Sequence, residues 1–208
     1  MSLRSQFKRW LLRVSGDSTF GLFLKLYEQI REDLTVHYGE WDRPGFRALA
    51  VHRFGAMLKD KEGLLWRLLS LIYRFMFRYV RNHYGIELPA TTIVGRRFLI
   101  GHQHGIIIHP NAEFGDDCII VQNVTIGNVA VGRKNSGPKF GHRVEFGAGA
   151  VILGSITVGD DVRIGPNAVV ITDLPAGSRV FVDPPRMMQM KKPQGNVTET
   201  FEETSRSA

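Results

Sequence analysis

The chain has 208 residues, of which 43% are hydrophobic and 23% charged, a balance typical of globular proteins rather than disordered or fibrous ones. Its one cysteine, Cys118, excludes a disulfide scaffold and any zinc site built from several cysteines, and is typical of a reducing compartment. Arginines interrupt the most apolar stretch before it reaches the roughly 18 residues of a membrane span, and the apolar run near the N-terminus is too short for a secretory signal, so we expect a cytoplasmic protein.

The formal net charge of +7 is concentrated in the first part of the chain. Residues 1–85 hold 15 basic and 8 acidic side chains, whereas residues 86–208 are neutral. A basic surface attracts nucleic acid, anionic lipid or a phosphorylated cofactor. Because no nucleic-acid-binding motif accompanies the charge, we expect no nucleic-acid partner.

Apolar residues recur at helical spacing throughout this basic part. The pattern predicts helices over about 3–14, 19–34, 46–58 and 64–82, and Pro44 is suited to the opening of the third. On the last helix the spacing places four arginines on one face, namely Arg67, Arg74, Arg78 and Arg81. These arginines either contact a membrane surface or polyanion, or are solvated or paired with a neighbouring subunit while the helix packs on its apolar side. We favour the second interpretation, because rows of charge on helices are usually solvated.

From Leu88 onward an apolar residue recurs at every sixth position, with two breaks. The thirteen positions are Leu88, Val94, Ile100, Ile108, Phe114, Ile120, Ile126, Phe140, Phe146, Ile152, Val158, Ile164 and Val170. Glycine follows directly in eight of them, at Gly95, Gly101, Gly115, Gly127, Gly141, Gly147, Gly159 and Gly165. A hexapeptide period is typical of a parallel β-helix, in which three hexads close a triangular coil.

This period predicts the inside of the coil. The recurring apolar residue points inward, and small or branched residues four positions later fill the space beside it: Ala112, Cys118, Val124, Val144, Ala150, Val162 and Ala168. Cys118 is therefore expected to be a packing residue rather than a reactive thiol. We expect the glycines to turn corners at positive φ. After Val170 we expect the chain to leave the coil through residues 173–177.

The two breaks in the period predict loops that project from the coil. Ile100 and Ile108 are eight residues apart, so two extra residues are extruded around residues 102–105. Ile126 and Phe140 are fourteen apart, which leaves an excursion over residues 129–139. Loops on a rigid scaffold are where binding and catalytic residues tend to lie.

Several segments resemble the bacterial serine acetyltransferases, including the shorter members associated with surface-polysaccharide biosynthesis. The matching runs are Gly45–Arg53 (GFRALAVHR), Val121–Gly127 (VQNVTIG) and Gly147–Gly154 (GAGAVILG). The resemblance implies an α+β fold with an N-terminal helical segment followed by a left-handed parallel β-helix of hexapeptide repeats. The expected domains are helical residues 1–85, the β-helical acyltransferase domain 86–186, and a polar C-terminal tail 187–208.

The resemblance also implies catalytic residues. The family's catalytic histidine aligns with His102, in Gly101-His102-Gln103-His104-Gly105, and its acidic partner aligns with Glu87. A neutral imidazole can remove the proton of a hydroxyl as that hydroxyl attacks a thioester, and a carboxylate can fix the tautomer of the ring. With eighteen residues per coil, residues fifteen apart are expected to face each other on neighbouring coils, about 4.8 Å apart.

The family's co-substrate is acetyl-CoA, which lies between the β-helices of two subunits. By position the resemblance implies contacts at Gly147, Ala148, Arg163 and Pro166, with Arg163 near the phosphates. A homotrimer, or a hexamer of two trimers joined through the N-terminal helices, is therefore expected. We expect no metal, because the alternating His102 and His104 lack the further ligands that would complete a zinc set.

The acceptor is where the chain departs from the family. The family binds serine with an Asp before the catalytic histidine and with an Arg-His pair, and these positions are Gly101, Ser136 and Gly137 here. L-Serine remains the first expectation, with a high Michaelis constant unless another cation such as Arg133, Lys134 or His104 substitutes. A sugar hydroxyl is the alternative. A non-catalytic scaffold is a third reading, against which the retained His102 and Glu87 argue. The chain lacks a terminal isoleucine, so no complex with a cysteine-forming enzyme is expected.

Overall fold

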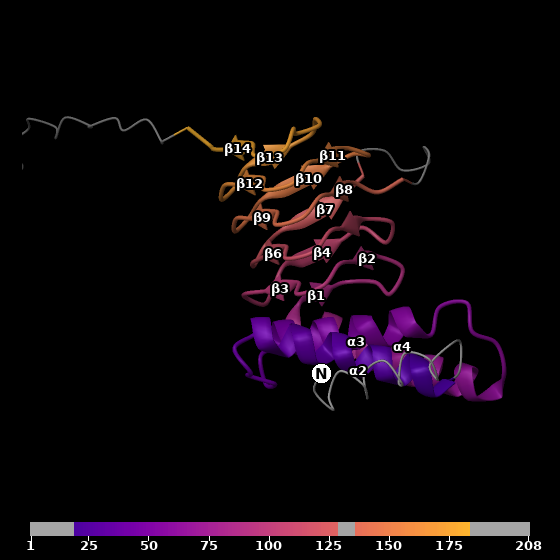
Figure 1. Ribbon diagram of the computed structural model, residues 1–208. Helices are drawn as coiled ribbons and strands as arrows, with labels where there is room; N and C mark the ends of the chain where they lie inside the picture. Colours follow the sequence, from indigo (N-terminus) through magenta and orange to yellow (C-terminus); the bar gives the residue numbers. More distant parts are fainter. Residues whose placement is uncertain (1–18, 129–135, 184–208) are drawn as a thin grey trace, which may run out of the picture.

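The computed structural model describes residues 19–128 and 136–183, and Figure 1 shows their arrangement. Helices α2 (Thr19–Val36), α3 (Pro44–Met57) and α4 (Leu64–Tyr84) lie side by side across one end of a β-helix. These helices confirm the predicted second, third and fourth helices to within two residues at each end. The helix expected over residues 3–14 and the expected tail over residues 187–208 lie outside the described residues.

Within the described residues, fourteen short strands form three parallel sheets, which we name A, B and C. Sheet A contains β1 (Ile86–Glu87), β4 (Ile106–Ile108), β7 (Thr125–Gly127), β10 (Val151–Leu153) and β13 (Val169–Val170). Sheet B contains β2 (Ile93–Val94), β5 (Glu113–Phe114), β8 (Lys139–Phe140) and β11 (Thr157–Val158). Sheet C contains β3 (Leu99–Ile100), β6 (Ile119–Ile120), β9 (Glu145–Phe146), β12 (Arg163–Ile164) and β14 (Arg179–Val180). The chain visits the sheets in the order A, B, C, so it winds into a β-helix with three edges, A–B, B–C and C–A, in agreement with the predicted left-handed β-helix.

The interior of the β-helix is the predicted one. Twelve of the thirteen hexad positions are buried, and Val94 is half-buried against the same core. All seven of the small or branched packing residues are buried as well. Cys118 is fully buried, and burial raises the pKa of its thiol to about 11, which confirms a packing role.

The expectation for the hexad glycines was wrong. None of the eight has a positive φ; at the corners that turn through the left-handed region, this conformation falls on the third residue after the inward one, as at Asp117, Asn123 and Asn167. The glycines are required for a different reason, which is the close stacking of coils. A Cβ on Gly95 would lie 2.2 Å from the carbonyl oxygen of Gly115 on the next coil.

The expected exit from the coil was also wrong. Leu174 pairs with Val158 at the position of sheet B, and β14 then adds a further strand to sheet C. Only four residues separate the inward Val170 from the inward Leu174, after which the spacing to Val180 is six again, so the six-residue period alone does not reveal this last coil. The β-helix therefore extends at least to Val180.

Buried polar side chains fix the helical layer on the base of the β-helix. Arg53 of α3 pairs with Asp33 of α2 (Nε to Oδ2, 2.8 Å) and donates to the carbonyl oxygens of Val94 (2.6 Å) and Gly95 (2.5 Å). His37 donates from Nδ1 to the Asp33 carbonyl and accepts the Ile100 N–H at Nε2. These contacts hold the end of β3, which lies two residues before His102.

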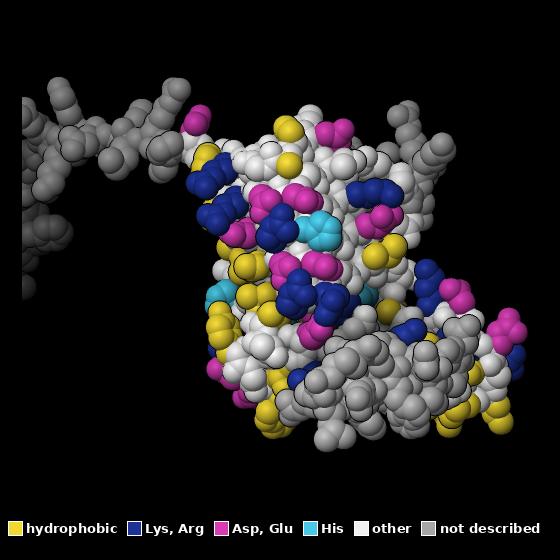
Figure 2. All heavy atoms as spheres, viewed as in Figure 1, with side chains coloured by type: hydrophobic (Ala, Val, Ile, Leu, Met, Phe, Trp, Pro, Cys, Tyr) yellow, Lys and Arg dark blue, Asp and Glu magenta, His cyan; other side chains and the backbone are white. Residues whose placement is uncertain are grey.

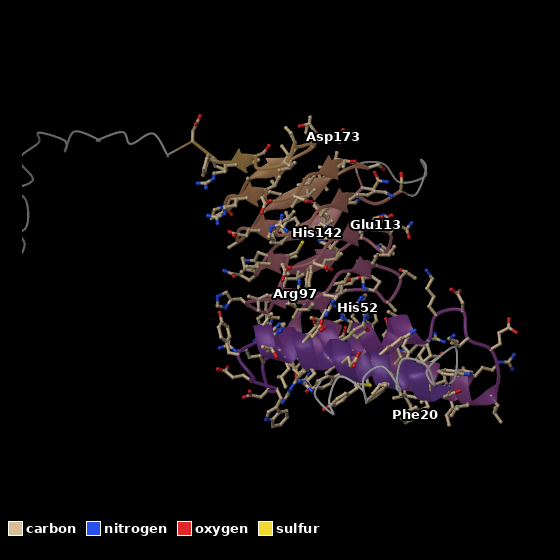
Figure 3. All side chains as sticks on the ribbon, viewed as in Figure 1. Phe20, His52, Arg97, Glu113, His142 and Asp173 are labelled. Carbon is tan, nitrogen blue, oxygen red and sulfur yellow. The ribbon has the colours of Figure 1, made fainter. Side chains whose placement is uncertain are left out.

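The two buried histidines predict a stability that depends on pH. Burial lowers the pKa of His52, labelled in Figure 3, from 6.5 to about 3, and also lowers the pKa of His37. Between pH 6.5 and 3 His52 binds more protons in the unfolded chain, so its contribution to the free energy of unfolding falls as the pH falls, by up to about 1.4 kcal/mol per pH unit. His37 acts in the same direction below pH 6.5. Urea unfolding at pH 7.5, 6.5 and 5.5 measures this slope. We expect His52→Asn, which keeps an N–H donor for the Pro89 carbonyl, to reduce it; an unchanged slope would contradict the assignment.

Helix α4 has apolar residues on two faces. Tyr73, Phe77 and Val80 pack toward the core, as predicted for the apolar side. On the opposite face further apolar residues are exposed: Leu64, Leu65, Leu68, Leu71, Ile72, Phe75, Met76 and Tyr79. The four arginines lie beside this exposed face and are solvated. No helix within the described ranges is long and apolar enough to cross a membrane.

Candidate active site

The B–C edge of the β-helix is stabilised by its own charges. Arg97 pairs with Asp117 on the next coil (Nε to Oδ1, 2.5 Å), and Arg143, two coils after Arg97, pairs with Asp161 on the coil that follows it (Nε to Oδ1, 2.6 Å). Figure 2 shows basic and acidic side chains interspersed on this face, and Figure 3 labels Arg97 and His142 there. Side chains on this edge also accept backbone N–H groups, as His142 Nδ1 does from Asp116. This edge is therefore occupied by structural contacts.

The C–A edge is different, because its corner positions are uncharged. The register of sheet C places Gln122, Ala148 and Pro166 one above another, each two residues after its strand's inward residue. Below them the chain bulges. The N–H of Gly101 donates to the Ile120 carbonyl and the N–H of Asn123 donates to the His104 carbonyl, so both ends of the bulge remain in register. The two extra residues predicted here are His102 and Gln103.

The bulge opens a pocket of about 480 Å³ beside the start of α3. Its lining consists of Arg43, Pro44, Gly45, Gly101, His102, Gln103 and Gln122. His102 is exposed to this space. The site thus combines a projecting imidazole from the β-helix with the first residues of a helix that lies 45 or more residues earlier in the chain. Arg43 and Gln122 were not predicted from the sequence.

Glu87 lies in the first coil, on the outward face of β1, and is half-buried. The two extra residues lengthen this coil to twenty, so Glu87 faces Ile107 rather than a residue fifteen positions later. The loop that carries His102 nevertheless runs alongside the start of β1, because the His104 N–H donates to the Tyr84 carbonyl and the Ile106 N–H to that of Gly85. Among the residues that the structure describes, the Glu87 carboxylate has no hydrogen bond or ion pair.

A groove of about 340 Å³ lies along the outer face of sheet C next to the C–A edge. Three of the predicted acetyl-CoA contacts, Gly147, Arg163 and Pro166, line it, and Ala148 adjoins Gly147 at the corner. Gly147 leaves the backbone accessible, and Arg163 is half-exposed while paired with Glu145 (3.2 Å). Arg179 stands next to Arg163 in the register of β14 and β12. Arg179 was not predicted from the sequence, because it lies in the last coil, which the six-residue period does not reveal.

The long excursion leaves the β-helix at a different edge. It connects β7 of sheet A with β8 of sheet B, whereas His102 lies between sheets C and A. Residues 129–135, which include Arg133 and Lys134, lie outside the described residues. Ser136 bonds Ser155 (Oγ to Oγ, 2.8 Å), and a Cβ on Gly137 would lie 2.3 Å from the Asn111 carbonyl oxygen. A larger residue therefore does not fit at position 137 unless the loop moves.

The described residues contain no group of three His, Cys, Asp or Glu side chains that would hold a metal ion. His104 contacts Gln103, and the Nδ1 atoms of His109 and His142 accept backbone N–H groups. These histidines belong to separate local contacts.

Comparisons with known proteins agree with the hexapeptide-repeat fold. Residues 137–172 match the family model described as bacterial transferase hexapeptide (six repeats). The chain is 42% identical over 136 residues to a serine acetyltransferase of Helicobacter pylori, which covers 65% of this chain and 75% of that protein. It is 34% identical over 150 residues to the serine acetyltransferase of Mycobacterium tuberculosis, covering 72% of this chain and 63% of that protein.

Solved structures share the fold. A serine acetyltransferase of Neisseria gonorrhoeae in complex with serine superposes with a TM-score of 0.65 at 24% identity, covering 77% of this chain and 68% of that one. Isoform 3 from Entamoeba histolytica, in complex with cysteine, gives a TM-score of 0.69 at 24% identity, covering 83% and 63% of the two chains.

Proposed function

Because the chain belongs to the serine acetyltransferase family, we propose that it transfers the acetyl group of acetyl-CoA to the hydroxyl of L-serine. The observation that supports this best is the C–A edge, where one line of corners joins a projecting histidine to the groove on sheet C. O-Acetylserine formed in this way would feed cysteine synthesis. A lone buried thiol is consistent with a cytoplasmic enzyme.

His102 acts as general base in this proposal. A serine hydroxyl is a poor nucleophile at neutral pH, so the imidazole removes its proton as the oxygen attacks the thioester carbonyl carbon. The C–S bond then breaks, and the imidazolium returns the proton to the departing sulfur. O-Acetylserine and free coenzyme A result, with no acyl-enzyme. The buried Cys118 takes no part.

Glu87 orients the imidazole and stabilises the imidazolium. Its carboxylate is half-buried, lies next to the backbone that supports the His102 loop, and has no other partner within the described part of the chain. A carboxylate that holds the second ring nitrogen selects the tautomer whose free nitrogen accepts the proton.

Acetyl-CoA fits the groove on sheet C. Gly147 and Ala148 present backbone to an extended chain, Pro166 continues the line, and Arg163 with Arg179 places two cations at the far end for phosphate groups. The thioester would then reach His102 from the C–A edge.

An acceptor screen tests the proposal against its alternative, transfer to a sugar hydroxyl. Thiol release from acetyl-CoA is measured with L-serine and with neutral sugars, and the product is identified by mass spectrometry. We expect O-acetylserine from L-serine. Turnover of a sugar together with inertness toward L-serine would replace the proposed function with the alternative.

We propose that the active unit is a homotrimer. The chain leaves β7 and re-enters β8 at the A–B edge, whereas His102 lies at the C–A edge, so in our proposal the excursion completes the His102 site of a neighbouring copy. A groove on the outer face of sheet C likewise needs a second wall. Light scattering on the active enzyme should therefore give a multiple of three times 23.5 kDa. An active monomer would contradict this assembly.

The exposed apolar face of α4 is covered, in our proposal, by a second trimer, since the helical layer lies at one end of the β-helix. Replacing two central residues of this face, Leu68→Glu and Phe75→Glu, should convert hexamers to trimers that keep their activity. Trimers of the unchanged protein that sediment with anionic vesicles, but not with neutral ones, would instead assign this face and its arginines to a membrane surface.

A further inference from the structure

The pocket at the bulge holds three chemically different groups around one space. His102 supplies a base, Arg43 supplies a cation, and Gln122 supplies an amide side chain. We propose that Arg43 binds the carboxylate of the acceptor and Gln122 its ammonium group, so that these two residues select a zwitterionic amino acid. The inference rests on the proposed acetyl transfer and specifies how the acceptor is recognised.

Arg43 is placed to bind a carboxylate. Its Nε donates to Glu40 (2.5 Å), and its guanidinium lies 5.0 Å from the centre of the Tyr38 ring. These two contacts fix the side chain without using its terminal nitrogens. Within the described residues its two terminal nitrogens donate no hydrogen bond. A guanidinium with both terminal nitrogens available binds a carboxylate through two parallel hydrogen bonds.

The N-terminus of α3 also favours a negatively charged group next to Arg43. Arg43 is the residue before Pro44 at the first helical position, and no side chain of the described residues caps this 14-residue helix. The first N–H groups of a helix point out of its N-terminus and favour negative charge. Gly45, whose added Cβ would lie 2.1 Å from the Ile100 carbonyl oxygen, brings this terminus against the strand that leads to His102.

Gln122, in contrast to the cationic Arg43, has a side-chain acceptor that lacks a hydrogen-bond donor within the described part of the chain. Its Oε1 atom is buried and, among the described residues, accepts no hydrogen bond. A buried acceptor without a donor is costly, and a turn of the amide toward the pocket that Gln122 lines would let an ammonium group there supply the donor. Gln122 follows Ile120 in the coil directly above Ile100, so it stands over the bulge that carries His102.

The positions that bind serine in the resembling family do not offer these charges here. Gly101 has no side chain, Ser136 bonds Ser155, and Gly137 has no space for a Cβ. His104 contacts Gln103 rather than the pocket. A pair at Arg43 and Gln122 would provide both charge partners from within one chain.

The test compares three acceptors that differ by one group each: L-serine, L-serinamide without the carboxylate, and 3-hydroxypropanoate without the ammonium. In the unchanged enzyme we expect L-serine to have the highest kcat/KM. Arg43→Gln should lower kcat/KM for L-serine at least about tenfold and change L-serinamide by less than threefold. Gln122→Leu should lower kcat/KM for L-serine and leave 3-hydroxypropanoate nearly unchanged.

Arg47→Gln is the matched control, because Arg47 lies one turn along α3 and contacts Trp41 and Tyr84 instead of the pocket. It should leave the preference among acceptors unchanged. The Michaelis constant for acetyl-CoA and the melting temperature report on the fold of each variant.

Two outcomes would overturn the inference while the proposed function stands. One is an unchanged enzyme that uses L-serine no better than L-serinamide. The other is an Arg43→Gln variant that loses both acceptors equally, which would show a structural role. Turnover of a sugar with no use of any of the three acceptors would instead reject the proposed function, and the inference with it.

Discussion

Replacing His102 by alanine should lower the turnover number by two to three orders of magnitude or more, with the Michaelis constant for acetyl-CoA nearly unchanged. General base catalysis contributes about 10²- to 10⁴-fold, and His102 is the imidazole that lines the pocket at the bulge. Steady-state rates of thiol release measure the effect. A His102→Ala variant that retains near-normal rates would remove the proposed mechanism.

Two further variants separate His102 from its neighbours. Glu87→Gln should keep the fold and lower turnover less than the loss of His102 does, because it removes orientation rather than the base. His104→Asn should retain most activity, since His104 contacts Gln103 and does not line the pocket. Asparagine tolerates the φ of +74° at this position.

Gly95→Ala should destabilise the fold by about 3 kcal/mol or more, because its Cβ would lie 2.2 Å from a backbone oxygen that belongs to the next coil. For a domain of this size the melting temperature should fall by about 6–12 °C. Thermal unfolding followed by circular dichroism at one fixed protein concentration measures the shift, since assembly makes the melting temperature depend on concentration.

Gly127 provides a matched control for this prediction. It also follows an inward hexad residue and also lacks a positive φ, but its Cβ would lie 3.4 Å from Leu153 Cδ2, an ordinary contact. Gly127→Ala should therefore be neutral or slightly stabilising. Equal losses in both variants would show that backbone conformation, not coil spacing, requires these glycines.

The β-helix was predictable because the requirement for an apolar inward residue repeats at every coil face. Every inward position meets the same crowded interior, so residues such as Ile120 and Ile152 had to be apolar at a constant spacing. The reason for the glycines was not predictable, because glycine is favoured both where φ is positive and where two coils approach closely. The last coil was missed because the spacing between inward residues shortens to four between Val170 and Leu174 before it returns to six at Val180.

The candidate site was predictable only where it lies on the repeat. His102 interrupts the hexads, and Gly147, Arg163 and Pro166 occupy equivalent corners or strands, so their common edge follows from the period. Arg43 enters the site through the docking of α3 on the base of the β-helix, which depends on buried contacts such as those of Arg53. No local pattern encodes such a contact between distant segments.

The stacked corners of the C–A edge also act as a ruler. Each coil raises the next corner by one strand spacing, roughly 4.8 Å. In the proposed binding mode, the number of coils between His102 and the arginine pair at Arg163 and Arg179 therefore sets how long a donor can be when its thioester reaches the base. Insertions between consecutive strands, such as the one between β7 and β8, leave the number of coils and therefore this length unchanged. Only the gain or loss of a complete coil changes it, and then by a whole step. A β-helix can therefore vary its acceptor pocket while the distance available to the acyl donor along the C–A edge stays fixed.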